Sequence, residues 1–304
     1  MNKKLIAIAV AGAFSAPMAA QAADVSGFAQ IDWTLANDNA ACTVATFENC
    51  ETQFSVHEAE VDFENNGVRV DIDTVNGGGD INVEQANFTT ALGAWNLTAG
   101  LFNSGLTADS QDIVDMAFAS NSLVFDLYDG AGLTNVAGLA FSGMAGPANV
   151  TVALVNDPTV NPGATGTATV AGDKANAVVV AASGSVMEGL DIGVSMVSAE
   201  ADDLTDVIVS YTMDALTAGL DYMTSDAVDA YSVTVGYDLG NGINVKARID
   251  NAELTSGYKT DTTTLHVGYH LADNIEIALE NYDYSEDNSA NDYSTTVVDL
   301  VATF

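Results

Sequence analysis

The sequence predicts an all-β protein, a transmembrane antiparallel β-barrel of about sixteen strands with short periplasmic turns and longer extracellular loops. Three observations predict this fold class. Apolar and polar residues alternate with period two over long stretches, the links between these stretches alternate between short and long, and the N-terminal residues have the pattern of an export signal. A strand with one lipid-facing side and one water-facing side produces such an alternation.

The export signal is expected at residues 1–22. Lys3 and Lys4 precede an apolar run, and small residues at 20–22 form a cleavage site, which together are typical of a secretory signal peptide. An N-terminal membrane anchor is the alternative, but an anchor needs about 20 apolar residues and carries no cleavage site. We therefore expect residues 23–304 to form a single β-barrel domain after cleavage and export.

The strands follow from the alternation and from the links. In one clear example, Ile243, Val245 and Ala247 alternate with Asn244 and Lys246. An even number of strands with short turns on one side and longer links on the other brings both termini to the short-turn side, which is the layout of a transmembrane β-barrel. The expected strands are 24–35, 54–64, 68–75, 81–90, 95–102, 135–143, 149–157, 174–183, 189–198, 205–214, 216–225, 230–239, 243–252, 262–271, 275–284 and 294–304.

The links between these strands set the register and the loops. If Asn66 and Gly67 form a two-residue type I′ turn, Phe63 pairs with Val70 and Glu64 with Arg69, so apolar partners share one face. The longer links are expected at 36–53, 76–80, 103–134, 158–173, 199–204, 226–229, 253–261 and 285–293.

The charge is strongly lopsided, with 42 Asp and Glu against 7 Lys and Arg and a formal net charge of −35. This balance excludes a nucleic-acid partner, because binding phosphates requires clustered Lys and Arg. A hydrophobic content of 48% also argues against a disordered acidic chain. Removing Lys3 and Lys4 with the signal leaves 5 basic residues against 42 acidic ones, a formal charge of −37.

Much of the acid falls on the water-facing side of the predicted strands or in the longest link. The expected pore-lining acids are Glu58, Glu60, Asp62, Asp71 and Asp73 on strands and Asp109, Asp112, Asp115, Asp126 and Asp129 in the link 103–134, with Asp32, Asp191, Asp206, Asp221, Glu276, Glu280 and Asp299 on the same face of other strands. The expected pore-lining bases are Arg69, Lys246 and Arg248.

The signal peptide, the strand layout, the hairpin VTVGYDLGNGINVKARID (233–250) and the last strand ending in Phe304 resemble the Gram-negative outer-membrane porins of the general-diffusion type. The segment 83–106 also resembles a hairpin of β-barrel porins. The resemblance implies a homotrimer in outer-membrane lipid through which small hydrophilic solutes diffuse. It also implies that Phe304 is read by the barrel-assembly machinery.

The resemblance further implies that the link 103–134 folds inward and narrows the pore. The link lacks the Pro-Glu-Phe-Gly-Gly type of motif found in enterobacterial porins. Two alternatives stay open for it: an exposed loop, or an additional strand near 122–128.

An acidic lining predicts a cation-selective channel, because a pore lined by one sign of charge attracts counter-ions. Adaptation of the surface to a saline habitat is a second, compatible explanation of the acid. No metal site or cofactor is expected, although the acidic clusters could bind Ca²⁺ or Mg²⁺ weakly.

The two cysteines, Cys42 and Cys50, lie in a polar stretch of an exported chain, so a disulfide within a loop is expected. A metal or redox pair is the alternative, but the spacing matches no metal motif.

Two other classes of function compete with a channel. A barrel hydrolase could use His266 and His270 with Thr264, but no Gly-x-Ser-x-Gly motif occurs, so we expect no enzyme. A secreted β-rich adhesin or coat protein would share the alternation and the turns, but does not require sixteen strands or a terminal Phe.

Overall fold

The computed structural model describes residues 24–37, 53–75, 80–103, 118, 120–130, 135–156, 176–199, 203–287 and 292–304. The predicted signal peptide, both cysteines, Asp109, Asp112 and Asp115 lie outside these residues. Among the described residues, no helix is both long and apolar enough to cross a membrane.

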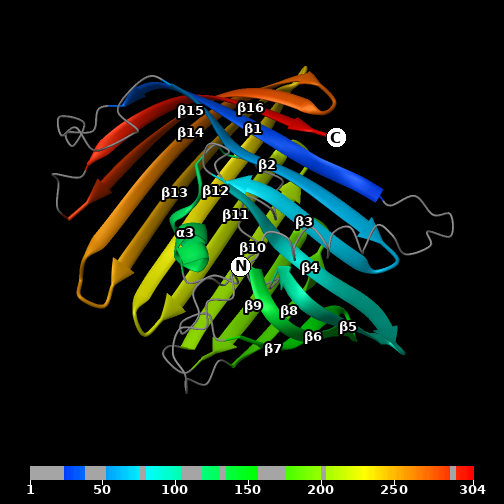
Figure 1. Ribbon diagram of the computed structural model, residues 1–304. Helices are drawn as coiled ribbons and strands as arrows, with labels where there is room; N and C mark the ends of the chain where they lie inside the picture. Colours follow the sequence, from blue (N-terminus) through cyan, green and yellow to red (C-terminus); the bar gives the residue numbers. More distant parts are fainter. Residues whose placement is uncertain are drawn as a thin grey trace.

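The described chain forms sixteen strands and one short helix, α3 (Leu123–Gly130) (Figure 1). The strands are β1 (Asp24–Asn37), β2 (Gln53–Asn65), β3 (Val68–Val75), β4 (Asp80–Leu92), β5 (Trp95–Asn103), β6 (Asn135–Ala145), β7 (Ala148–Val155), β8 (Ala177–Met187), β9 (Leu190–Ser198), β10 (Asp203–Met213), β11 (Leu216–Ser225), β12 (Val228–Gly240), β13 (Ile243–Leu254), β14 (Lys259–Ala272), β15 (Ile275–Glu286) and β16 (Tyr293–Thr303).

Each strand pairs antiparallel with its neighbours in the sequence, and β1 pairs with β16 to close the barrel. Closure satisfies the backbone groups that an open sheet edge would leave unpaired. The closed sixteen-strand antiparallel barrel confirms the predicted fold class. One link differs from expectation, because β11 and β12 are joined by only Asp226 and Ala227 where a longer link was expected at 226–229.

The predicted register of the first tight turn is confirmed. Phe63 pairs with Val70 and Glu64 with Arg69, and the turn residues Asn66 and Gly67 have φ values of 51° and 78°. Two successive positive φ values are the signature of a type I′ turn, whose twist matches that of the strands it joins.

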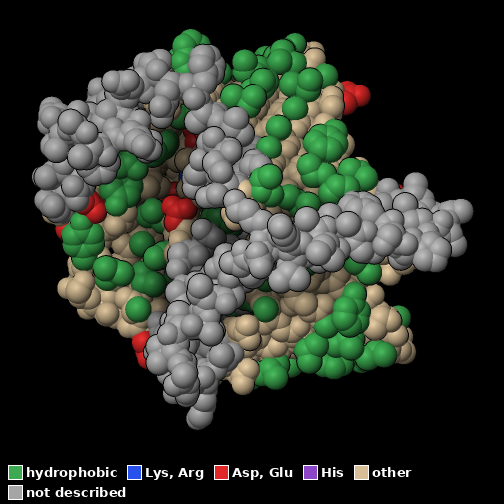
Figure 2. Space-filling model, viewed as in Figure 1, with side chains coloured by type: hydrophobic (Ala, Val, Ile, Leu, Met, Phe, Trp, Pro, Cys, Tyr) green, Lys and Arg blue, Asp and Glu red, His purple; other side chains and the backbone are tan. Residues whose placement is uncertain are grey.

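The two faces of the wall differ sharply in exposure and chemistry. On β13, Ile249 is 55% exposed whereas its neighbours Arg248 and Asp250 are each 1% exposed. Figure 2 shows many hydrophobic side chains over the outside, with acidic side chains visible in the hollow and at the edges of the barrel. The apolar residues therefore form most of the outer wall, whereas charged residues such as Arg248 and Asp250 point inward.

The segment that contains α3 lies inside the ring of strands, against β11, β12 and β13 (Figure 1). Ser122 caps the helix, since its Oγ accepts a hydrogen bond from the Phe125 N–H at 3.0 Å and its carbonyl accepts one from the Asp126 N–H at 3.0 Å. Val124 is fully buried and belongs to an apolar cluster with inward-facing residues such as Met223 and Ala230. Burial of this apolar face holds the helix on the inner wall.

Candidate functional site

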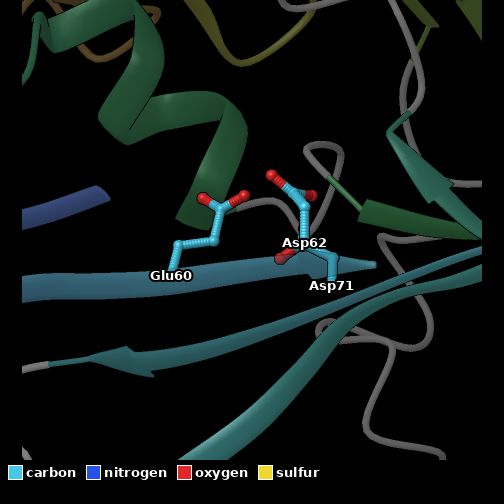
Figure 3. Close-up of side chains that lie close together, drawn as sticks. All are labelled: Glu60, Asp62 and Asp71. Carbon is cyan, nitrogen blue, oxygen red and sulfur yellow. The ribbon is translucent and has the colours of Figure 1, made fainter. Parts of the chain in front are cut away.

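The inward faces of β2 and β3 carry a tight group of carboxylates, Glu60, Asp62 and Asp71. One oxygen from each lies within 4.8 Å of the other two, and Figure 3 shows the three side chains close together. Arg69 Nη2 binds Asp62 Oδ1 at 2.7 Å and Asp71 Oδ2 at 3.4 Å, and Gln85 Nε2 donates to the same Asp71 oxygen at 3.3 Å. Carboxylate oxygens suit a hard cation, but one guanidinium already neutralises part of this cluster.

Carboxylates also face one another directly across neighbouring strands. The register places Asp62 opposite Asp71 and Glu60 opposite Asp73, and it places Asp32 opposite Asp299 where the barrel closes. Like charges directly opposite each other destabilise a sheet. Their repetition on the inner face therefore points to a role in function rather than in stability.

A second group of charges fixes the segment 120–122 to the inner wall. Arg248 Nη1 donates to the Ser120 carbonyl at 2.8 Å, while Nη2 donates to Ser120 Oγ at 3.0 Å and to the Asn121 carbonyl at 2.6 Å. Glu280 Oε1 accepts hydrogen bonds from the Ser120 N–H at 2.9 Å and from its hydroxyl at 2.6 Å. We call Ser120, Arg248 and Glu280 the latch, because together they bind one segment to two strands.

Further contacts orient the latch. Asp250 Oδ2 accepts a hydrogen bond from Arg248 Nε at 3.0 Å, and His266 Nδ1 lies 3.1 Å from Glu280 Oε2. The ring of Phe118 packs over Arg248, with 4.7 Å from Cζ to the ring centroid, and lies edge-on to His266 at 5.6 Å. Hydrogen bonds, ion pairs and a cation–π contact together hold Phe118 and Ser120 against Arg248 and Glu280 on the inner wall.

Every Lys and Arg in the described part of the chain has a carboxylate partner. Arg69 pairs with Asp62 at 2.7 Å, Lys246 with Glu276 at 3.8 Å, Arg248 with Asp250 at 3.0 Å and Lys259 with Glu253 at 2.8 Å. Each base is therefore matched by acid, and the remaining inward carboxylates, such as Asp73, Asp206 and Asp221, leave the interior with a surplus of negative charge.

Two hollows with both polar and apolar lining residues lie along the wall from β2 to β10. One of about 410 Å³ is bordered by Arg69, Gln85, Asn87 and Thr151 among others. Another of about 330 Å³ is bordered by Thr151, Asp191, Ser195 and Asp206 among others. Residues such as Phe102, Ala140 and Ile208 also line these hollows, so water-binding groups and apolar surface lie side by side on this part of the inner wall.

The predicted pore-lining residues fall into three sets. Glu60, Asp62, Asp71 and Asp73 lie on the inner wall of β2 and β3, together with Arg69. Asp126 is exposed on α3, while Glu58 on β2 and Asp129 on α3 lie at positions whose side chains are not described. An additional strand near 122–128 is wrong, because α3 occupies this stretch.

Arg248 differs from the expectation of a base that lines an open pore. It faces inward, but it is 1% exposed because the segment 120–122 covers it. The histidines considered for catalysis both contact carboxylates. The two ring nitrogens of His266 face Glu280 and Glu276, and His270 Nε2 lies 3.1 Å from Glu276 Oε2. Thr264 Oγ1 accepts a long hydrogen bond from Arg248 at 3.4 Å.

Several residues of this group, among them Asp250, Phe118 and Ser120, were not among the predicted site residues. Asp250 has the same strand parity as Arg248, so the alternation alone could have assigned it to the inner wall. Ser120 carries no periodic signal, because it lies in a link, and only the folded chain brings it to Arg248 and Glu280.

No family model matches the chain, and no curated protein matches it. Solved structures of outer-membrane porins share its fold. They include Salmonella typhi OmpF in complex with daunomycin, with a TM-score of 0.68 and 9% identity over 93% of this chain and 97% of that one. The anion-selective porin of Comamonas acidovorans has a TM-score of 0.67 and 10% identity over 93% and 99%. A mutant of the Rh. blastica porin has a TM-score of 0.60 and 15% identity over 93% and 100%. The chain therefore has the sixteen-strand fold of Gram-negative outer-membrane porins.

Proposed function

We propose that this chain forms a water-filled channel in the outer membrane, through which small hydrophilic solutes diffuse passively with a preference for cations. The observation that carries the proposal is the inner wall, where the three described inward-facing bases, Arg69, Lys246 and Arg248, are each paired with a carboxylate and further acids line the same wall. A fixed surplus of one sign raises the local concentration of counter-ions and repels ions of the same sign.

The fold by itself does not decide the sign of the selectivity, since one porin with this fold is anion-selective. Selectivity has to come from the side chains that this chain places on the fold. The directly opposed pairs Glu60–Asp73, Asp62–Asp71 and Asp32–Asp299 support a cation preference, because each pair favours a cation nearby over an anion.

The proposal includes the assembly of the channel. The terminal Phe304 and its partner Gly27 exchange backbone hydrogen bonds of 3.0 and 3.2 Å, so the last residue takes part in closing the barrel. Export through the signal at residues 1–22, recognition of Phe304 by the assembly machinery and a homotrimeric state complete the proposed mode of action.

Reversal potentials in a planar bilayer under a KCl gradient test the proposal. We expect K⁺ to be preferred over Cl⁻ in the wild type, and less so in the double variant Glu60→Gln, Asp73→Asn. The matched control is Asp261→Asn, Asp283→Asn, which removes the same charge from exposed outward-facing positions and should leave the potential nearly unchanged. A preference for Cl⁻ in the wild type, or no conductance at all, would refute the proposed function.

A further inference from the structure

Three tyrosines gather on the inner face of the barrel near the loop end of β15 and β16. Tyr282 and Tyr284 follow Glu280 at intervals of two residues on β15, and the register places Tyr284 opposite Tyr293 on β16. Tyr293 has the same strand parity as the buried Asp299. The tyrosine patch, Tyr282, Tyr284 and Tyr293, thus points into the barrel rather than toward lipid.

The rings of the tyrosine patch form a corner. The rings of Tyr284 and Tyr293 are stacked with centroids 4.9 Å apart at 19°, and the ring of Tyr282 meets that of Tyr293 at 81° with centroids 5.8 Å apart. Cross-strand stacking explains the first pair. Tyr282 reaches Tyr293 as a diagonal neighbour across the same strand pair. Membrane anchoring does not explain why all three rings point into the barrel rather than toward lipid.

Carboxylates flank the tyrosine patch. The Tyr284 hydroxyl donates to Glu286 Oε2 at 3.2 Å, and Asp126 on α3 lies within electrostatic range of Tyr293. Tyr258, in the turn before β14, also hydrogen-bonds Glu286, which raises the pKa of its hydroxyl to about 12. Phenol oxygens and carboxylates therefore converge on one region.

Three of the described bases form ion pairs with carboxylates other than Asp126 and Glu286. Lys259 has the outward strand parity and binds Glu253 at 2.8 Å, while Lys246 and Arg248 bind Glu276 and Asp250. Aromatic faces attract cations through their quadrupole, and the recognition of quaternary ammonium groups by aromatic side chains is the common functional use of this attraction. Adjacent carboxylates strengthen the same preference.

We propose that the tyrosine patch, with Glu286 beside it and Asp126 on α3 inside the barrel, is a binding site for small organic ammonium cations on their way through the channel. This inference rests on the proposed channel function and deepens it by naming a solute class. It places a selective site at the loop side of the latch, so an ammonium solute meets the tyrosines before it reaches Asp32 and Asp299.

Block of the potassium current tests the site. The channel is placed in a planar bilayer in KCl, and tetramethylammonium chloride is added on the loop side. We expect a saturable reduction of the current in the wild type, and a half-blocking concentration about fivefold higher in Tyr293→Leu. Tyr293→Phe keeps the ring and should behave like the wild type. Asp126→Asn, which leaves all rings in place, should also weaken the block.

The matched control is Tyr222→Leu, because Tyr222 is an outward-facing tyrosine that is 39% exposed. Equal block in the wild type and in Tyr293→Leu would overturn the proposal, as would a tyrosine-dependent block by the neutral sugar maltose. Calorimetric titration of the detergent-solubilised barrel with tetramethylammonium gives a readout that does not depend on current. If the channel prefers K⁺ but shows no tyrosine-dependent binding of tetramethylammonium, the proposed ammonium site is refuted and the proposed channel function is not.

Discussion

At the scale of single residues, two turn glycines with the same backbone conformation differ in the space around them. Gly67 has φ +78° and Gly93 has φ +69°, a region in which an L side chain costs about 1–2 kcal/mol. A Cβ on Gly67 would also collide with the Thr89 carbonyl oxygen, whereas a Cβ on Gly93 would meet nothing within 4 Å. We expect Gly67→Ala to lower the free energy of unfolding by about 1–3 kcal/mol more than Gly93→Ala does.

Urea unfolding of the detergent-folded barrel measures both variants, with heat-dependent gel mobility as a second assay. Gly93→Ala is the control, because it reports the cost of the backbone conformation without the collision. Equal losses in the two variants would show that β4 moves aside at no cost and that the close approach of Gly67 to Thr89 is not a constraint.

At the scale of elements, the latch is expected to hold α3 and the segment before it on the wall. Arg248→Met removes the three hydrogen bonds to Ser120 and Asn121 and leaves Asp250 without its base. Loss of one partner of a buried ion pair costs about 3–5 kcal/mol. We expect larger and noisier single-channel currents, because the freed segment no longer keeps one position inside the barrel.

Ser120→Ala tests the same element without a change in charge. It removes only the hydroxyl bonds to Glu280 and Arg248, so we expect a folded channel with a smaller increase in noise. Lys259→Met is the control, since this base forms an outward ion pair far from the latch along β14. Current noise equal to that of the wild type in both latch variants would contradict a positioning role for Arg248 and Ser120.

The strands and the latch also show what could be predicted from the sequence. All sixteen strands were predictable, because lipid on one side and water on the other impose period two, and a tight turn such as Asn66–Gly67 fixes the register. The same parity assigned Asp71, Asp73 and Arg248 to the inner wall. The cover over Arg248 was not predictable, since it depends on Ser120 and Asn121 in a link, where no periodicity constrains the chain and only tertiary packing sets the position.

At the scale of the whole molecule, net charge and closed shape act together. A chain with 42 acidic and 7 basic residues would repel itself as a compact globule, but a barrel spreads the acid around a hydrated interior. Each described base is paired with a carboxylate. The electric field inside the barrel therefore comes from carboxylates on several strands of the inner wall rather than from one compact site. Fields of this kind depend on salt, because mobile ions screen charges over a Debye length of about 30 Å at 0.01 M and about 3 Å at 1 M.

We therefore expect the permeability ratio of K⁺ to Cl⁻, from reversal potentials at a fixed gradient, to be highest near 0.01 M salt and to fall toward unity near 1 M. In Glu60→Gln, Asp73→Asn the ratio should start lower and change less with salt, because fewer fixed charges remain to be screened. The outward control Asp261→Asn, Asp283→Asn should follow the wild-type curve. A ratio that stays constant over this range would contradict a diffuse acidic lining, since a preference set by close contact with a dehydrated ion would not respond to screening.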